Sequence, residues 1–185
     1  MNTTIVVARY NENIDWTKDF SNVIIYNKGS PLDIQNEIIL NNVGKEGHTY
    51  YTYICEHYEK LNDYTIFLQG NPFDHSPDIV SLLNHYTTNK LNIDFNFLSP
   101  DIKCYLSGCH HHSGLPLIDV YEKLFNKKKT NMEFVFGGGA QFIVSKSNIL
   151  KKPKSFYLKI VQMLENDINP IEGFVIERFH KLIFE

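Results

Sequence analysis

Polar side chains that could do chemistry are concentrated in a loop that follows a short apolar, strand-like segment. The loop reads Gln69-Gly70-Asn71-Pro72-Phe73-Asp74-His75. Gln69 and Asn71 can donate and accept hydrogen bonds, and Gly70 lets a ligand approach the backbone. Asp74 and His75 could bind a metal ion or transfer protons. A hydrogen-bonded turn capped by Asp74 would explain one or two of these residues, and we interpret the whole set as a candidate site.

A second polar group follows the first strand-like segment, where the chain reads Arg9-Tyr10-Asn11-Glu12. Arg9 could hold a diphosphate through two parallel hydrogen bonds, and Asn11 or Glu12 could contact a base or a ribose. An ion pair at the end of a strand is the structural alternative, and these residues alone do not decide between the two.

A third group stands at the start of an expected helix and reads Gly44-Lys45-Glu46-Gly47-His48-Thr49. Backbone N–H groups at a helix start, together with Lys45 and His48, would suit an anion such as pyrophosphate. Glu46 has an equally good structural role, because a carboxylate in the first turn interacts favourably with the helix dipole. Both interpretations stay open.

Three further sets contain reactive or permissive residue types. Cys109-His110-His111-His112, with Cys104 nearby, lacks the spacing of a zinc site and is expected to form a polar loop. The run Gly137-Gly138-Gly139 allows backbone contact with a flat ligand, or forms a bulge. Glu177 and Arg178 border the apolar stripe of the last helix, so they either extend outward or face an interior cleft where Glu177 could act as a base.

Alternating strand-like and helix-like segments must position these residues. Short β-branched runs predict strands, and apolar residues at helical spacing predict helices. The strands are expected at 5–10, 23–26, 64–68, 95–98, 103–106, 134–136 and 141–144, and the helices within 11–20, at 47–61, from 76 onward, at 153–165 and at 170–184. Such alternation implies βαβ units, so residues 1–185 are expected to form a single α/β domain with a mostly parallel sheet. Ligands of such sheets bind beyond the carboxyl ends of the strands.

The overall composition excludes several classes of protein. With 43% hydrophobic and 21% charged residues, the 185-residue chain is typical of a folded domain. A net charge of −3 without a basic stripe argues against nucleic-acid binding. No apolar run approaches the roughly 20 residues of a membrane span, and no signal peptide precedes the first strand. The three cysteines lack a disulfide-scaffold pattern, which favours free thiols and a cytoplasmic location.

Three stretches of the chain resemble an uncharacterised domain family. They read Val6-Val7-Ala8-Arg9-Tyr10-Asn11-Glu12, Phe67-Leu68-Gln69-Gly70-Asn71-Pro72-Phe73-Asp74-His75 and Gly139-Ala140-Gln141-Phe142-Ile143-Val144-Ser145. The resemblance covers nearly the whole chain. By itself it implies little about activity.

The layout is also distantly similar to small GT-A glycosyltransferases that build surface polysaccharides. This second resemblance implies a GT-A-like (Rossmann-like) α/β fold, a UDP- or GDP-sugar donor, and transfer of the sugar to a glycan or protein hydroxyl. In that case Arg9, Asn11 and Glu12 would contact the nucleotide. The diphosphate and the sugar would lie by Gln69, Asn71 and Asp74, and the candidate bases are His75 and Glu177.

The sequence departs from GT-A enzymes at one important position. Where those enzymes usually carry a metal-binding Asp-x-Asp, this chain reads Gln69-Gly70-Asn71. Neutral amides replace carboxylates poorly as ligands of Mg²⁺ or Mn²⁺. Either Asp74 and His75 hold the metal, or cationic side chains neutralise the diphosphate, or the activity has been lost. The cations expected at the diphosphate are Arg9, Lys28, Lys45 and Arg178.

Two other functions compete with this interpretation. The first is a non-catalytic domain that binds a nucleotide or a sugar. The second is a metal-dependent hydrolase that uses Asp74, His75 and the cluster His110–His112, which predicts a tightly bound zinc or manganese ion. Because 185 residues is short for a GT-A enzyme, the acceptor site is expected to be open or to be completed by a partner, for example in a homo-oligomer.

Overall fold

Strand β1 (Thr3–Arg9) runs through the middle of the fold, and all of its residues after Thr3 are buried. A strand covered on both faces needs an almost unbroken apolar run, which Ile5-Val6-Val7-Ala8 provides. The adjacent strand β4 (Tyr64–Gln69) is buried in the same way up to Leu68. The structure is a computed structural model, and it describes residues 2–109 and 111–185.

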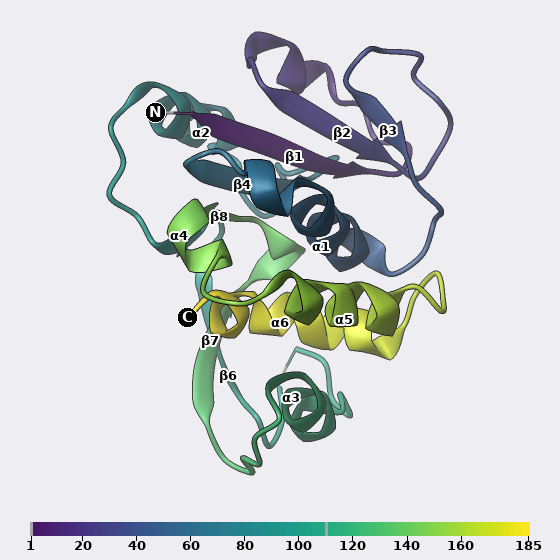
Figure 1. Ribbon diagram of the computed structural model, residues 1–185, viewed down its shortest axis with the longest axis vertical. Coiled ribbons are helices and arrows are strands. Elements are labelled where there is room, and N and C mark those ends of the chain that lie inside the picture. Colours follow the sequence, from purple (N-terminus) through teal and green to yellow (C-terminus); the bar gives the residue numbers. More distant parts are fainter. Residues whose placement is uncertain (1, 110) are drawn as a thin grey trace.

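Six strands form the main sheet, in the order β3-β2-β1-β4-β8-β5 (Figure 1). The other members of this sheet are β2 (Val23–Asn27), β3 (Glu37–Ile39), β5 (Phe95–Phe97) and β8 (Phe142–Ser145). The pairs β1–β2, β1–β4 and β2–β3 are parallel, whereas β8 is antiparallel to both of its neighbours. A separate antiparallel pair is formed by β6 (Asp101–Tyr105) and β7 (Glu133–Gly137).

The helices are α1 (Lys45–His57), α2 (Ile79–Thr88), α3 (Leu117–Phe125), α4 (Lys146–Ile149), α5 (Lys154–Leu164) and α6 (Ile171–Phe184). Helices α1, α5 and α6 pack on one face of the main sheet and α2 on the other, whereas α3 lies beside β6, β7 and the helices α5 and α6 (Figure 1). Side chains alternate along β1, so Val6 packs into the core with α1, α5 and α6, whereas Ile5 and Val7 pack into the core with α2. The larger core contains most of the buried aromatic side chains.

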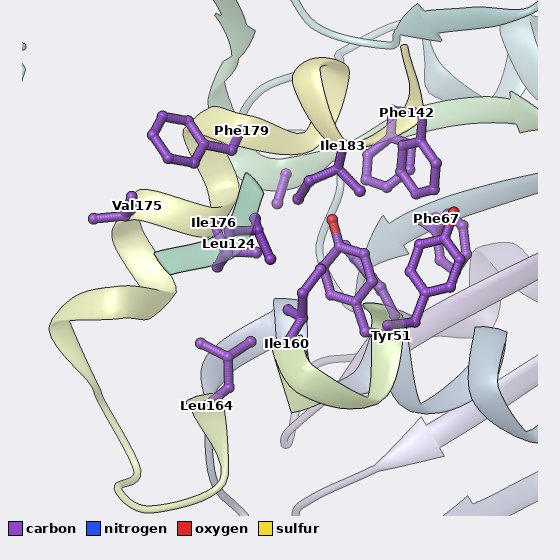
Figure 2. Packing of buried hydrophobic residues seen from close by; sticks show 14 of the residues in the cluster. Tyr51, Phe67, Leu124, Phe142, Ile160, Leu164, Val175, Ile176, Phe179 and Ile183 are labelled. Carbon is purple, nitrogen blue, oxygen red and sulfur yellow. The ribbon is translucent and has the colours of Figure 1, made fainter. Parts of the chain in front are cut away.

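Phe142 of β8 lies at the centre of this aromatic core (Figure 2). Its ring centroid is 5.0 Å from that of Phe67, 5.8 Å from that of Tyr50 and 4.6 Å from that of His180. Phe142 therefore joins the sheet to α1 and α6, the two helices that carry several of the candidate site residues.

The order of the strands creates a point where the chain switches direction across the sheet. From β1 the chain proceeds outward to β2 and β3, and it then returns to the other side of β1 to form β4. The loops after β1 and β4 therefore diverge to opposite sides, which leaves a crevice beyond the carboxyl ends of these strands. Among the described residues, no helix has the length and apolar character needed to cross a membrane.

The expected α/β fold with a mostly parallel sheet is confirmed, and several boundaries are corrected. The segment within 11–20 forms only a short 3₁₀ helix, Asp15–Asp19, and α2 begins at Ile79 rather than at Ser76. Strand β3 and the helices α3 and α4 were not expected. In α3 the buried residues Leu117, Val120, Tyr121 and Leu124 have the helical spacing that would have revealed it.

Replacement of Phe142 by Ala is expected to lower the free energy of unfolding by about 3–5 kcal/mol, because it leaves a cavity among packed rings. The matched control is Leu158→Ala on the exposed side of α5, where the side chain is 41% exposed and the expected change is within about 0.5 kcal/mol. Chemical denaturation of both variants measures the difference. Equal stabilities would contradict the assignment of Phe142 to the centre of the core.

Candidate functional site

The buried guanidinium of Arg9 fixes the loops that follow β1 and β2. Its Nη1 donates to Asn27 Oδ1 at 2.8 Å and to the carbonyl of Ser30 at 3.0 Å, and its Nε donates to the carbonyl of Glu12 at 3.0 Å. Asn27 in turn donates through Nδ2 to the Glu37 carboxylate, which also accepts the backbone N–H of Leu32 at 3.0 Å. Arg9 therefore uses its donors to hold the walls of the crevice.

Next to this network lies a pocket of about 270 Å³, which we call the lysine pocket. It is lined by Ala8, Arg9, Tyr10, Glu12, Lys28, Asn42, Lys45, Glu46, Ile168 and Asn169. These residues come from the ends of β1 and β2, from the start of α1 and from the connection between α5 and α6. Two lysines and two glutamates make this pocket strongly polar.

Lys28 is half-buried in the pocket. Its Nζ donates to the carbonyls of Val43 and Lys45. An ammonium has three N–H donors, so a ligand in the pocket can accept the third. Burial lowers the pKa of Lys28 to about 8, and the negative charge of Glu46 acts in the opposite direction. An anion in the pocket would favour the charged form of this lysine.

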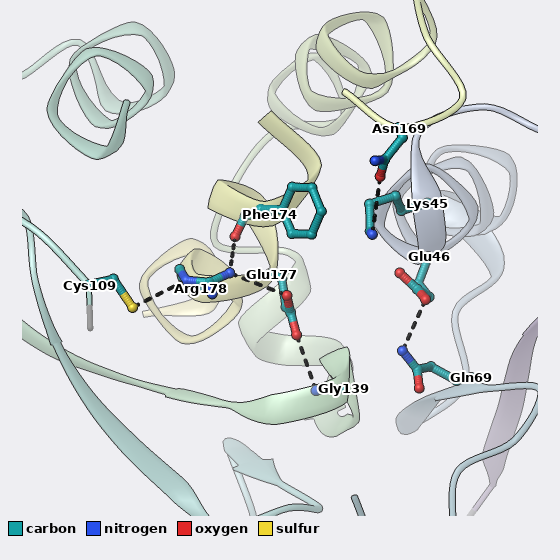
Figure 3. Close-up of polar contacts among 9 residues, drawn as sticks. All are labelled: Lys45, Glu46, Gln69, Cys109, Gly139, Asn169, Phe174, Glu177 and Arg178. Atoms are coloured by element: carbon teal, nitrogen blue, oxygen red, sulfur yellow. Dashed lines mark hydrogen bonds and ion pairs between the residues drawn. The ribbon is translucent and has the colours of Figure 1, made fainter. Parts of the chain in front are cut away.

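Lys45 extends from the first residue of α1 toward the segment that precedes α6 (Figure 3). Its Nζ donates to Asn169 Oδ1 at 3.2 Å and lies 3.9 Å from the ring centroid of Phe174. Its backbone has φ of 54°, an uncommon conformation for a residue other than glycine, as expected at the tight entry to the helix. His48, one turn later, is buried, and burial together with the charge of Lys28 lowers its pKa to about 4.

Two carboxylates come from different helices, Glu46 from α1 and Glu177 from α6, and Gln69 at the end of β4 lies beside Glu46 (Figure 3). Glu46 Oε1 accepts the Gln69 amide at 2.9 Å, and Glu177 Oε1 accepts the backbone N–H of Gly139 at 3.1 Å. Burial raises the pKa of Glu177, and the charge of Glu46 raises it further, against the opposing effect of Arg178. The same two carboxylates act on the buried hydroxyl of Tyr50 and add to the rise that burial causes in its pKa. Such a pair of acidic groups is a candidate for proton transfer.

A second, more open hollow of about 480 Å³ shares Glu12 with the lysine pocket, and we call it the aromatic hollow. Its other lining residues are Asn13, Trp16, Asn71 and Phe73. Trp16 Nε1 donates to the carbonyl of Gly70 at 3.0 Å, and the Trp16 and Phe73 rings meet edge to face with centroids 6.4 Å apart. Aromatic faces beside amide and carboxylate groups can bind a molecule that has both apolar and hydroxyl-bearing surfaces.

Gly70 is required for this arrangement. A Cβ atom at this position would lie 2.5 Å from Glu12 Oε2, the oxygen that accepts the backbone N–H of Tyr10 at 2.7 Å and of Asn11 at 3.1 Å. The close approach of these loops keeps Glu12 between the lysine pocket and the aromatic hollow.

The remaining candidates lie around this centre. Asn11 is exposed, and its Oδ1 accepts the backbone N–H of Ser30 at 2.9 Å. Asp74 is exposed and accepts the Asn71 amide at 3.2 Å, and the exposed His75 packs its ring against Gly139. Gly139 has φ of 76°, and a Cβ there would lie 2.3 Å from the His75 ring.

Other expected groupings are not brought together. Among residues 2–109 and 111–185, no three His, Cys, Asp or Glu side chains are grouped so that they could hold a metal ion. His110 lies outside the described residues, whereas His111 packs near Phe136 and His112 near Phe174. Arg178 turns into the protein, where it stacks 4.8 Å from the ring centroid of Phe136.

The sequence interpretation missed several residues of this site. Trp16 and Phe73 were not considered as binding residues, and neither were Asn13, Asn42 and Asn169. Their side chains meet only because loops distant in sequence converge. The polar run around Asn169, just before a predicted helix, was the available signal for that residue.

Comparison with known proteins gives a family but no activity. Residues 5–185 match the family described as "Protein of unknown function (DUF3431)". No curated protein matches the chain, and no solved structure matches it.

We expect Lys28 to titrate near pH 8, and Glu46→Gln to lower its pKa further because the substitution removes a charge that stabilises the ammonium. Acylation of the lysines across a pH series, followed by mass spectrometry, measures the pKa of Lys28 in the wild type and in the Glu46→Gln variant. The control is Glu133→Gln, a change at the ion pair with Lys103. A Lys28 pKa that is unchanged by Glu46→Gln, or equal to that of an exposed lysine, would contradict the described pocket.

Proposed function

The chain belongs to the DUF3431 family, and from the chemistry of its site we propose that it is a glycosyltransferase of the GT-A type. In this proposal it moves a sugar from a nucleoside diphosphate to a hydroxyl group of a glycan or a protein. The observation that carries the proposal is the pair of adjoining hollows at the switch point of the sheet. One offers ammonium groups, and the other offers aromatic faces and amides.

The lysine pocket suits the diphosphate of such a donor. Lys28 and Lys45 contribute positive charge at the end of the sheet where ligands of open α/β folds bind. In sugar transfer the diphosphate departs with increasing negative charge, so cations fixed beside it stabilise the transition state. Of the cations expected from the sequence, Arg9 and Arg178 are at most 7% exposed and are surrounded by protein acceptors. Lys28 and Lys45 are half-buried in the pocket, and their hydrogen bonds to the described residues use only part of the three donors of each ammonium, so they are better placed.

The position that carries Asp-x-Asp in GT-A enzymes has another role in this chain. The Gln69 amide donates to Glu46, and the Gly70 carbonyl accepts from Trp16. Neutral amides are weak ligands for Mg²⁺ or Mn²⁺, so we propose that the lysines neutralise the diphosphate. Asp74 and His75, the metal ligands expected from the sequence, are exposed, and neither is among the residues that line the two hollows. Donor binding that strengthens with Mn²⁺ would favour them instead.

The aromatic hollow suits the sugar or its acceptor. The face of an aromatic ring packs against the C–H groups of a sugar, and Asn13, Asn71 and Glu12 offer hydrogen bonds to its hydroxyls. The acceptor oxygen then attacks the anomeric carbon while the bond from that carbon to the diphosphate oxygen breaks. Glu177 is the proposed base that takes the acceptor proton, because burial and Glu46 both increase its affinity for a proton.

Substitution of Lys28 or Lys45 by Ala is expected to weaken binding of a nucleoside diphosphate sugar at least about tenfold, as loss of a charged hydrogen bond predicts. Isothermal titration calorimetry with UDP- and GDP-sugars in EDTA measures the affinity. Lys103→Ala, on the exposed β6–β7 pair, is the control and should bind like the wild type.

The same affinity should decrease as the pH rises through about 8, where Lys28 loses its proton. Below this pH the ammonium is present and attracts the diphosphate, and above it the neutral amine does not. Lys28→Ala should flatten this dependence. Absence of binding to every donor tested, with and without Mn²⁺, would contradict the proposal.

Glu177→Gln is expected to reduce turnover about 10²–10⁴-fold while donor affinity changes little, because the amide cannot accept the proton. Transfer of a radiolabelled sugar to candidate acceptors measures turnover. His75→Ala is the comparison, since His75 is the other candidate base. Full activity of Glu177→Gln would exclude Glu177 as the base, and donor binding without turnover in the wild type would favour a non-catalytic binding domain.

A further inference from the structure

Two cysteines of the β6–β7 region lie in positions that suit a disulfide. Tyr105 and Gly108 form a hydrogen-bonded antiparallel pair, with N–O distances of 3.3 Å and 3.0 Å. Cys104 and Cys109 are the next pair outward from this turn. In an antiparallel ladder such a pair has Cα atoms about 4.5 Å apart, which lies within the range that a disulfide spans. Both cysteines are free thiols in this structure.

The Cys109 sulfur accepts a hydrogen bond from a buried arginine. Arg178 Nε donates to it at 3.4 Å, whereas the Cys104 thiol donates to the carbonyls of Gly108 at 3.7 Å and Tyr105 at 3.8 Å. Figure 3 shows Arg178 between the Cys109 sulfur and the Glu177 carboxylate. A guanidinium beside the sulfur stabilises a thiolate more than a thiol.

Cys109 lies close to the surface of the protein. Cys109 lines an open hollow of about 520 Å³, together with Tyr105, Ser107, Gly108, Ser113 and Gly114. Cys109 is 5% exposed and Cys104 is 1% exposed. Both thiols are therefore buried, and Cys109 is the one that lines the open hollow.

We propose that Cys109 and Cys104 form a reactive dithiol that a peroxide oxidises to a disulfide. The Cys109 thiolate attacks one oxygen of the peroxide, the O–O bond breaks, and the leaving alkoxide or hydroxide takes a proton from solvent. The resulting sulfenic acid is then attacked by the Cys104 sulfur, which forms the S–S bond and releases water. The two sulfurs lose two electrons in total, and the peroxide gains them.

The acidities of the two thiols agree with these roles. Burial opposes ionisation of Cys109, but its contacts with Arg178, Cys104 and His111 outweigh burial and lower its pKa. Burial raises the pKa of Cys104 to about 12, and the contact with Cys109 adds to this. The remaining cysteine, Cys55, is buried in α1, and burial raises its pKa to about 11. Cys109 is therefore the nucleophile and Cys104 the resolving thiol.

Oxidation of the two cysteines would change the contacts of Arg178, which also pairs with Glu177. Arg178 Nη1 donates to the carbonyl of Phe174 at 2.7 Å and lies 3.3 Å from Glu177 Oε2. A disulfide would make the sulfur that accepts from Arg178 Nε a weaker acceptor, and it would leave Glu177 as the anionic partner of Arg178. The proposal of a reactive dithiol rests on the contacts of the two cysteines and does not depend on the proposed sugar transfer.

Treatment of the full chain with hydrogen peroxide, followed by alkylation of the remaining thiols and mass spectrometry, tests the proposal. We expect Cys109 and Cys104 to lose reactivity together, at least about tenfold faster than Cys55, and to recover it with dithiothreitol. A peptide that carries a disulfide between residues 104 and 109 should appear at the same rate.

Two variants separate the roles of the thiols, with thermal melting as the check on folding. Cys104→Ala should accumulate a sulfenic acid on Cys109 that dimedone traps, and Cys109→Ala should leave Cys104 unoxidised. Cys55→Ala is the matched control and should oxidise like the wild type. Loss of Cys55 as fast as Cys109, oxidation of Cys109 with Cys104 still free, or oxidation of Cys104 in Cys109→Ala would each overturn the proposal.

Discussion

The candidate site depends on one buried positive charge, the guanidinium of Arg9. A buried cation is costly unless polar groups surround it, and the chain meets this requirement with Asn27 Oδ1 and the carbonyls of Tyr10, Glu12 and Ser30. These acceptors belong to the loops after β1 and β2, so satisfying the charge also fixes both loops. Lys28 and Glu12, which line the lysine pocket, take their positions from this network.

The positive charges near the site have different roles. Arg9 and Arg178 are each 7% exposed or less and are surrounded by protein acceptors, so both act mainly on the structure. Lys28 and Lys45 line a pocket and are also held by carbonyl oxygens or an amide, which restricts their motion before any ligand arrives. Cations that are already fixed lose less entropy when they bind an anion, and this is the property that a diphosphate site needs.

Much of the framework could be predicted from the sequence, because parallel strands buried on both faces leave long apolar runs. The runs in β1 and β4 also place Arg9 and Gln69 at one edge of the sheet. Strand β3 could not be predicted, because three half-buried or exposed residues are too few to show the alternation of apolar and polar side chains that marks a strand. The role of Arg9 could not be inferred either, because an arginine that holds loops and one that holds a diphosphate have the same local sequence.

Contacts between residues that are far apart in the chain could not be predicted from the sequence either. Lys45 contacts Asn169 across 124 positions, and Trp16 reaches the carbonyl of Gly70 across 54. These contacts depend on how α1 packs against α5 and α6, and on how the 3₁₀ segment covers the end of β4. Side-chain packing determines both arrangements, and the local pattern of apolar and polar residues in the sequence carries little information about that packing.

The most direct test of the central claim is a crystal structure of the protein with a nucleoside diphosphate sugar bound. The account predicts the diphosphate in the lysine pocket, within hydrogen-bond distance of Lys28 Nζ and Lys45 Nζ, and the sugar directed toward the aromatic hollow beside Trp16. A donor bound elsewhere on the chain, or a diphosphate held only by Asp74 and His75 through a metal ion, would contradict it.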